Sequence, residues 1–115
     1  MLQYHTIPVT AFQQNCSLVW CDQTQDAAVI DPGGDLETIL WEVERLALRL
    51  QAIWLTHAHI DHAGGTADLA EQHQLPIIGP HPGDQFWIDG LPQQGAMFGF
   101  PPSRPFVPTR WLADG

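Results

Sequence analysis

Short apolar runs separated by turn residues open the chain. Leu2–Val9 alternates between apolar and polar positions, and Cys16–Cys21 is apolar and rich in β-prone side chains. A third run, Ala27–Asp31, stops at the turn sequence Pro32-Gly33-Gly34. Because runs of this length bounded by turn residues are typical of adjacent strands, we predict a meander or a sheet edge over this part of the chain.

The next segment has the period of an amphipathic helix. Apolar side chains over residues 36–50 fall on one helical face, and Asp35 stands where an N-cap is expected. Glu37 near the start and Arg45 near the end suit the helix dipole. Ala52–Thr56 then predicts a buried strand. The order strand, helix, strand indicates an α/β fold.

The same order is then repeated. Thr66–His73 favours a helix, and Pro76–Gly79 a short strand. After Gly79 the chain is rich in proline and glycine with aromatic residues between them. Such a segment is too apolar for a disordered tail, so we predict a long ordered loop packed on the core, which would form a wall of the substrate site. A plain connecting loop is the simpler alternative.

Composition indicates one small domain. The chain has 115 residues, of which 44% are hydrophobic and only 15% are charged. In soluble domains, charged residues usually make up about a quarter of the sequence. Because a short domain has much surface to cover, the low charge indicates that some apolar surface is covered by chain that is absent here.

The charge excludes several classes of function. The formal net charge is −9, with four arginines and no lysine. This disfavours nucleic acids and anionic membranes as partners, since both are bound through basic patches. The absence of lysine also excludes a P-loop lysine and Schiff-base chemistry.

Cysteine use and the N-terminal residues indicate a soluble protein of a reducing compartment, the cytoplasm. Cys16 and Cys21 are five positions apart, which places them on opposite faces of a strand and argues against a disulfide between them. The first residues lack the basic and apolar regions of a secretory signal. No apolar run reaches about 18 residues.

Four side chains of metal-ligand type stand within six positions. The segment Thr56–Gly65 contains His57, His59, Asp61 and His62. His57 and His59 would point to one side of an extended segment, and Asp61 and His62 would follow in a tight loop near an adjacent metal. Two catalytic zinc ions need about six protein ligands in all, so four leave the site incomplete. For His5, His73 and His81 a structural role is the better interpretation.

The segment Thr56–Gly65 resembles the HxHxDH signature of the metallo-β-lactamase superfamily. Residues 12–19, Ile30–Gly34, the region 79–99 and the end at 110–115 resemble its glyoxalase II-like, single-domain branch. The resemblance implies an α/β fold, the αββα sandwich, of which residues 1–115 would be the N-terminal half. That partial domain would end before the family's three further metal ligands and its second β-layer.

The resemblance also implies the chemistry. It assigns His57 and His59 to a first metal and Asp61 and His62 to a second, with two zinc ions expected and iron or manganese as alternatives. Asp31 would brace the ligand loop. The implied reaction is hydrolysis of a small-molecule glutathione thioester such as S-lactoylglutathione by a metal-bridging hydroxide, which Asp61 would position.

Two other functions stay open at this point. The chain would otherwise be a non-catalytic, truncated half-domain with a weak or empty metal site that forms a homodimer through its uncovered sheet. An iron-dependent sulfur dioxygenase, whose ligand loop is similar, is the third interpretation. Diiron flavoprotein relatives are disfavoured because His59 stands where they carry a carboxylate, and nuclease relatives are disfavoured by the acidic charge.

Overall fold

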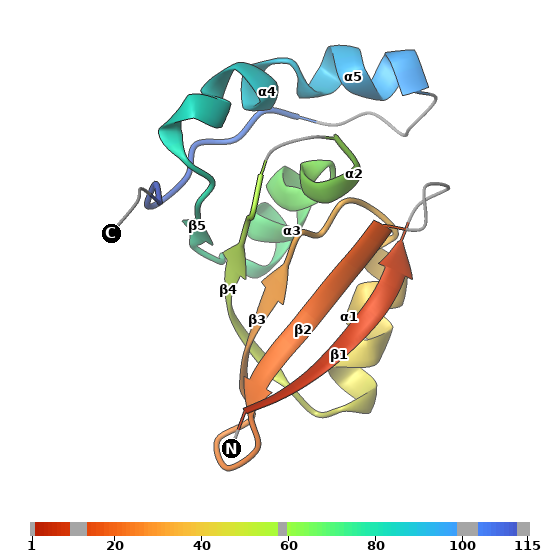
Figure 1. The fold of residues 1–115 in the computed structure, drawn as a ribbon. Coiled ribbons are helices and arrows are strands. Elements are labelled where there is room, and N and C mark those ends of the chain that lie inside the picture. The colour runs from red at the N-terminus through yellow and green to blue at the C-terminus, as the bar shows by residue number, and fades with distance from the viewer. Residues whose placement is uncertain (1, 10–13, 58–59, 99–103, 113–115) are drawn as a thin grey trace.

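The computed structural model describes residues 2–9, 14–57, 60–98 and 104–112, which form a five-stranded mixed sheet with helices against it (Figure 1). The strands lie side by side in chain order: β1 (Leu2–Val9), β2 (Gln14–Cys21), β3 (Asp26–Ile30), β4 (Arg49–Trp54) and β5 (Ile77–Ile78). β1, β2 and β3 pair antiparallel, whereas β3, β4 and β5 pair parallel. The predicted meander and the predicted α/β class are both confirmed.

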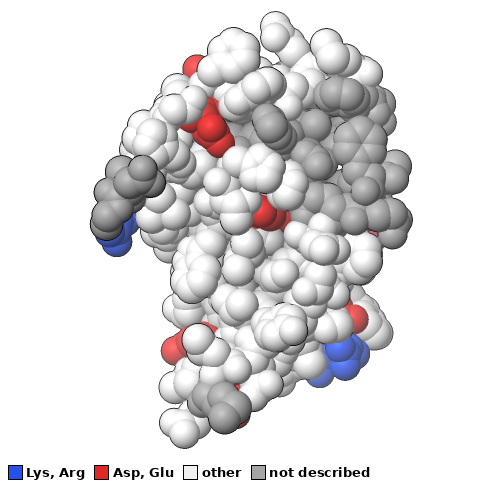
Figure 2. All heavy atoms as spheres, in the orientation of Figure 1, with Lys and Arg blue, Asp and Glu red and all other residues white. Residues whose placement is uncertain are grey.

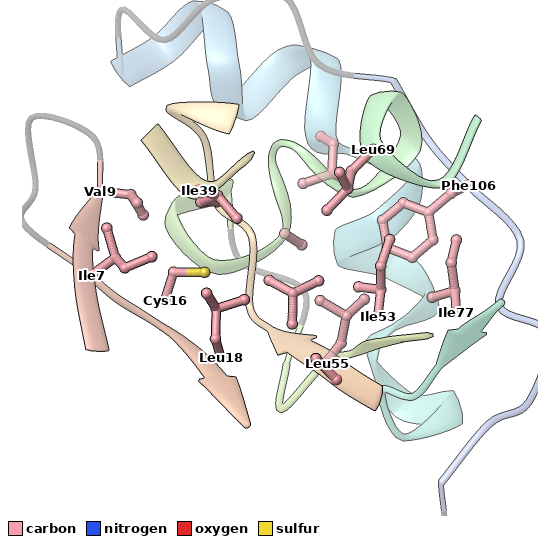
Figure 3. Close-up of a cluster of buried hydrophobic side chains, with 14 of the residues drawn as sticks. Ile7, Val9, Cys16, Leu18, Ile39, Ile53, Leu55, Leu69, Ile77 and Phe106 are labelled. Carbon is pink, nitrogen blue, oxygen red and sulfur yellow. The ribbon is translucent and has the colours of Figure 1, made fainter. Parts of the chain in front are cut away.

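One face of the sheet carries the hydrophobic core. Helices α1 (Leu36–Arg45) and α3 (Thr66–His73) cover this face and lie behind the strands in Figure 1. In β1 and β2 every second side chain points towards them, as the alternating burial of the strands shows. Figure 3 shows the resulting cluster, which includes Ile7, Val9, Cys16, Leu18, Ile39, Ile53, Leu55 and Leu69.

The opposite face of the sheet is open over the described chain. Leu2 and Tyr4 of β1 are 77% and 76% exposed, and Trp54 of β4 is 44% exposed. Cys21 also belongs to this face, because it pairs with Leu2, whereas Cys16 pairs with Ile7 and is buried on the helix side. The two thiols are therefore free and on opposite faces, as the sequence predicted.

The first helix is shorter than its apolar pattern predicted. α1 ends at Arg45, and Ala47 adopts a left-handed conformation with φ 56°. The Leu48 N–H donates to the Val43 carbonyl at 2.9 Å, which closes the helix end. β4 therefore begins at Arg49, not at Ala52. The helical pattern continued past this turn because the residues that follow also face the core, now from a strand.

Asp35 is the N-cap residue of α1, as predicted, but it does not cap the helix through its side chain. Asp35 precedes α1 but has φ 50°, and its side chain makes no capping hydrogen bond to the helix. Residues that cap a helix through the side chain typically have a β-region backbone, which the left-handed Asp35 does not adopt.

The predicted long loop after Gly79 is wrong for its first part. This part contains a 3₁₀ turn, η1 (Pro82–Asp84), and two helices, α4 (Gln85–Asp89) and α5 (Leu91–Phe98). Pro82 and Pro92 occupy first turns, where the missing N–H of proline removes no helical hydrogen bond. Ile88 and Leu91 are completely buried and hold the helices on the core.

The described segment 104–112 is extended and packs as predicted for an ordered loop. Phe106 is buried in the core. The Thr109 N–H donates to the Ile77 carbonyl at 2.8 Å, and Thr109 Oγ1 accepts from the Ile77 N–H at 3.0 Å. Ile78 and Arg110 form a parallel bridge, so this segment continues the sheet edge at β5. No helix within the described residues has the length and apolar character to cross a bilayer.

Candidate metal centre

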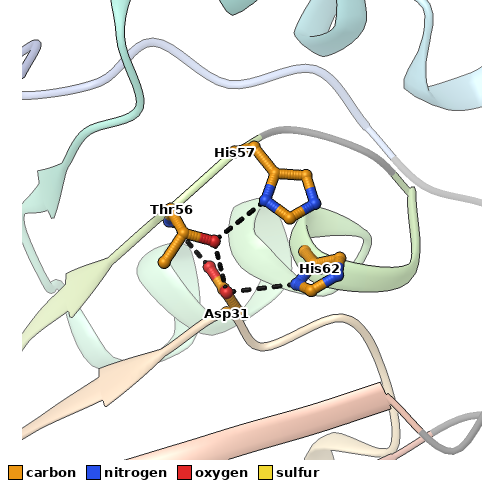
Figure 4. A network of polar contacts seen from close by, with 4 residues as sticks. All are labelled: Asp31, Thr56, His57 and His62. Atoms are coloured by element: carbon orange, nitrogen blue, oxygen red, sulfur yellow. Dashed lines mark hydrogen bonds and ion pairs between the residues drawn. The ribbon is translucent and has the colours of Figure 1, made fainter.

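The ligand-type residues gather where two parallel strands end. Asp31 follows β3, and Thr56 and His57 follow its neighbour β4. His62 lies in the short helix α2 (Ile60–Ala63). Because the carboxyl ends of parallel strands meet at one edge, side chains far apart in the sequence come together here (Figure 4).

Asp31 turns back towards β4 because of its backbone conformation. Its φ is 56°, in the left-handed region that aspartate tolerates better than most residues. The Asp31 N–H donates to the Trp54 carbonyl at 2.9 Å, and the Asp31 carbonyl accepts from the Gly33 N–H at 2.9 Å. Strained conformations of this kind are concentrated at functional sites.

Asp31 is 4% exposed, and its carboxylate accepts hydrogen bonds from three groups of the described residues Thr56 and His62. Oδ1 accepts from the Thr56 N–H at 2.8 Å. Oδ2 accepts from the Thr56 hydroxyl at 2.6 Å and from His62 Nδ1 at 3.1 Å (Figure 4). A buried carboxylate requires such donors, because an unpaired charge away from water is costly. Asp31 therefore fixes both the end of β4 and the imidazole of His62.

Hydrogen-bond donors and acceptors determine the tautomers of both imidazoles. A carboxylate only accepts, so His62 Nδ1 carries the proton that it donates to Asp31. The single hydroxyl proton of Thr56 is donated to Asp31, so His57 Nδ1, 3.0 Å from Thr56 Oγ1, must also carry a proton and donate. In this tautomer the lone pair is on Nε2. Both rings are therefore prepared to bind a cation through Nε2.

The two imidazoles lie next to each other. The ring centroids of His57 and His62 are 3.9 Å apart, with an angle of 48° between the planes (Figure 4). Neutral imidazoles held by a carboxylate and a hydroxyl are the usual form of histidine metal ligands.

Gly65 fits the ligand loop against the turn that contains Asp31. Its N–H donates to the Pro32 carbonyl at 2.8 Å. A Cβ at this position would lie 2.8 Å from that carbonyl oxygen and 2.8 Å from Leu36 Cδ2. Only glycine allows this close approach, which links α3 to the turn after β3.

The structure therefore describes half of the predicted ligand set. His57 and His62 come together, with Asp31 in hydrogen-bond contact with His62 and with the residue before His57. His59 and the side chain of Asp61 lie outside the described part of the chain. Asp61 and His62 belong to a short helix and not to the predicted loop. Among the described residues no three His, Cys, Asp or Glu side chains form a metal-binding group, so metal binding stays a prediction.

Thr56 is the residue that the sequence analysis missed. It was treated only as the end of a strand, although its hydroxyl connects Asp31 to His57. The sequence signal that could have indicated this role is a hydroxyl residue directly before a ligand-type histidine. Two of the other histidines have structural contacts: His5 Nε2 lies 3.3 Å from Glu42 Oε2, and His81 Nδ1 accepts from the Gly83 N–H at 2.9 Å.

A hollow of about 510 Å³ opens beside the site. Thr56 and His81 are its polar lining residues, and the remainder of the wall is apolar: Ile30, Trp54, Leu55, Ile78 and Leu112. An apolar hollow with a few polar groups near a reactive centre is the usual form of a small-molecule site. The predicted wall after Gly79 contributes His81 and Leu112 to it.

Cysteine chemistry is absent from the described part of this site. Burial raises the pKa of the Cys16 thiol to about 12, and the negative charge of Asp31 adds to the increase. A thiol with this pKa stays protonated at neutral pH, so Cys16 is a packing residue and not a thiolate ligand.

The chain is similar to known proteins over nearly its whole length. The family profile described as the metallo-beta-lactamase superfamily matches residues 9–115. The hydroxyacylglutathione hydrolase GloC of Haemophilus influenzae is 46% identical over 106 residues, which are 92% of this chain and 50% of that protein. The chain therefore spans about half the length of this relative.

Comparison with solved structures also shows similarity over nearly the whole chain. The structure of TTHA1623 in a di-iron-bound form is 32% identical with a TM-score of 0.85, covering 96% of this chain and 55% of that one. The BLEG-1 B3 metallo-beta-lactamase is 27% identical with a TM-score of 0.83, covering 98% of this chain and 54% of that one. On this sequence match and this fold, the chain belongs to the metallo-β-lactamase superfamily.

Proposed function

We propose that this chain carries part of the metal site of a hydrolase that cleaves a glutathione thioester such as S-lactoylglutathione. The single observation that carries the proposal is the Asp31-anchored pair of imidazoles at the ends of β3 and β4. The similarity to a hydroxyacylglutathione hydrolase over 92% of the chain supports the substrate class.

The residues fit a metal of borderline softness. His57 and His62 present Nε2 lone pairs, and imidazole nitrogen is a preferred ligand of zinc. His59 and Asp61 would supply the other two ligands of the HxHxDH signature, and further ligands would come from outside this chain. A bound zinc ion would supply Lewis acidity towards the thioester carbonyl and lower the pKa of a bound water.

The chain's own residues would hold and orient this centre. Asp31 keeps both Thr56 and His62 in place through three hydrogen bonds, so the imidazoles need little rearrangement on binding. Asp61 would help to position the attacking water. The hollow beside Thr56 offers an apolar wall to the acyl group or the thiol portion of the substrate.

Iron is the alternative metal, because the similar structure of TTHA1623 was determined in a di-iron-bound form. Iron in place of zinc would support the redox interpretation, a sulfur dioxygenase. Metal analysis of the chain purified without added metal separates the two. Zinc supports the hydrolase, and iron with no thioester turnover supports the oxidation chemistry.

A chimera tests the proposed reaction. Residues of this chain replace the matching half of the Haemophilus influenzae relative, and S-lactoylglutathione hydrolysis is followed by loss of the thioester absorbance. We expect turnover that is lost in His62→Ala and kept in His73→Ala, since His73 is an exposed histidine of α3. A folded, zinc-loaded chimera without turnover would contradict the proposal. Activity in the chimera but not in the chain alone would identify the chain as an inactive half-domain.

A further inference from the structure

His81 lies in the loop after β5, at the edge of the sheet that carries the candidate metal centre. β5 ends at Ile78 and runs parallel to β4, so the carboxyl ends of these two strands meet at the same edge. Thr56, which lies past the end of β4, and His81 both line the hollow of about 510 Å³ beside the site. The position of His81 is set by the strand ends, whatever covers the faces of the sheet.

The imidazole of His81 has a fixed tautomer, because Nδ1 accepts a hydrogen bond from the Gly83 N–H at 2.9 Å. A ring nitrogen that accepts carries no proton, so the proton of the neutral ring is on Nε2. His57 and His62 are the opposite case, since their Nδ1 atoms donate and their lone pairs are on Nε2. His81 therefore presents a hydrogen-bond donor where the other two imidazoles present a metal-binding lone pair.

The turn after His81 also holds the ring in place. His81 is the N-cap residue of η1, and a Cβ added to Gly83 would lie 3.2 Å from His81 Nδ1 and 3.7 Å from its Cε1. The ring is thus packed closely against a residue without a side chain. Because the Nδ1 edge faces this turn, the Nε2–H points away from it. Within the described part of the chain, Nε2 has no hydrogen-bond partner, and His81 is exposed.

The surroundings of His81 favour a ligand that carries oxygen acceptors. The described residues that line the hollow include no Asp or Glu, although the chain has 13 acidic residues and a net charge of −9. Figure 2 shows few charged side chains on this side of the molecule. An acidic chain repels an anionic ligand from most of its surface. An acid-free hollow with a donor at its wall is therefore a place where such a ligand can bind.

We infer that His81 is a substrate-binding residue, whose Nε2–H donates to a carbonyl or carboxylate oxygen of the glutathione portion of the substrate. This inference rests on the proposed function, which supplies the glutathione thioester. With the thioester at the metal centre, the peptide must extend away from it, and three extended residues span roughly 10 Å. Thr56, directly before His57, and His81 line one hollow, so the peptide can pass from the metal centre to His81. This contact is distant from the reacting bond, so it should affect KM and not kcat.

Two conservative variants separate substrate binding from the role of His81 in the turn. His81→Asn keeps an acceptor near the position of Nδ1 for the Gly83 N–H, but it has no donor at the position of Nε2. His81→Gln reaches that position with an amide N–H. In the chimera proposed above, we expect His81→Asn to raise KM for S-lactoylglutathione by roughly three- to tenfold with an unchanged kcat, as for loss of one neutral hydrogen bond. His81→Gln should restore most of the loss, and the Tm of His81→Asn should not change.

The ethyl thioester of lactate is the matched control substrate, because it has the same acyl group without the peptide. Its kcat/KM should be equal in His81→Asn and in the unsubstituted chimera. An active chimera in which His81→Asn leaves KM for S-lactoylglutathione unchanged would overturn the inference and leave the proposed function intact. An equal loss with both substrates would also overturn it. A chimera without turnover contradicts the proposed function instead, and binding to the chain then decides the role of His81.

Binding of S-methylglutathione to the 115-residue chain needs no turnover. Long-range ¹H–¹⁵N spectra should show the proton of His81 on Nε2, and this resonance should shift when S-methylglutathione is added. His73 is the control, since it is an exposed histidine of α3. A proton on Nδ1 of His81, no shift, or equal shifts of His81 and His73 would exclude a peptide-binding role for His81.

Discussion

Asp31 and His62 are 31 positions apart in the sequence, yet Asp31 Oδ2 lies 3.1 Å from His62 Nδ1. The same carboxylate accepts from the backbone and the hydroxyl of Thr56 at the end of the neighbouring strand. One buried aspartate therefore connects β3, β4 and α2. These hydrogen bonds, and not the ligand loop alone, therefore orient the imidazoles of His57 and His62.

Replacing Asp31 by asparagine should weaken zinc binding. The amide keeps one acceptor oxygen, but its NH₂ group would face a donor from Thr56 or His62. Loss of such a supporting contact typically reduces metal affinity by about 10- to 100-fold. Competition with a chromophoric chelator measures the affinity. Asp89→Asn is the control, since Asp89 is exposed on α4, where its Oδ1 accepts from Gln85 Nε2 at 3.0 Å. Equal affinity in both variants would contradict the role of Asp31.

Removing the Thr56 hydroxyl should affect His57. In Thr56→Val, His57 Nδ1 loses the acceptor that fixes its tautomer. We expect zinc affinity to fall by about tenfold or more, as for other supporting contacts. Thr56→Ser should restore it, because serine keeps the hydroxyl. If the Thr56→Val and Thr56→Ser variants bind zinc equally well, the hydroxyl does not orient His57.

Substituting alanine for Gly65 should destabilise the fold and disturb the ligand loop. The added Cβ would lie 2.8 Å from the Pro32 carbonyl oxygen, so either α3 or the turn after β3 must move. Overpacking of this kind costs about 1–3 kcal/mol. Thermal unfolding measures the loss. Gly90→Ala is the control: its Cβ would meet atoms at 3.4 Å and beyond, so its Tm should change little.

The two thiols should differ in their reaction with a disulfide reagent. Hydrogen bonds from the backbone of Thr24 and Gln23 lower the pKa of Cys21, so more of this thiol is ionised at mildly alkaline pH. Burial keeps the pKa of Cys16 at about 12, so its thiol stays protonated at that pH. Labelling of the folded chain should modify one thiol, and Cys21→Ser should abolish it. Two fast-reacting thiols in the folded chain would contradict the burial of Cys16.

The sheet and the ligand segment were predictable from the sequence for local reasons. Alternation in Leu2–Val9 and the apolar run before Pro32 determine strands whose neighbours are close in sequence. The spacing of His57 and His62 predicted a metal site, because few other patterns place histidines so densely, and the structure brings these two side chains together. These signals lie within one element and need no tertiary information.

The structural features that the sequence did not predict depend on backbone conformation and on tertiary contacts. Nothing in the pattern distinguishes Ala47 as a left-handed helix end, since the apolar positions continue into β4. The left-handed conformation of Asp31 depends on its hydrogen bond to Trp54. The helices after Gly79 were missed because proline was taken as a sign of a loop, although Pro82 and Pro92 occupy first turns, where proline is tolerated.

The most direct test of the account is a long-range ¹H–¹⁵N spectrum of the histidine side chains during a zinc titration. The account predicts that His57 and His62 carry their protons on Nδ1 before zinc is added. It also predicts that the Nε2 resonances of both rings shift on addition of zinc while the Nδ1 protons are retained. Rings protonated on Nε2, or Nε2 resonances that do not respond to zinc, would contradict the proposal that this Asp31-anchored pair is the metal centre.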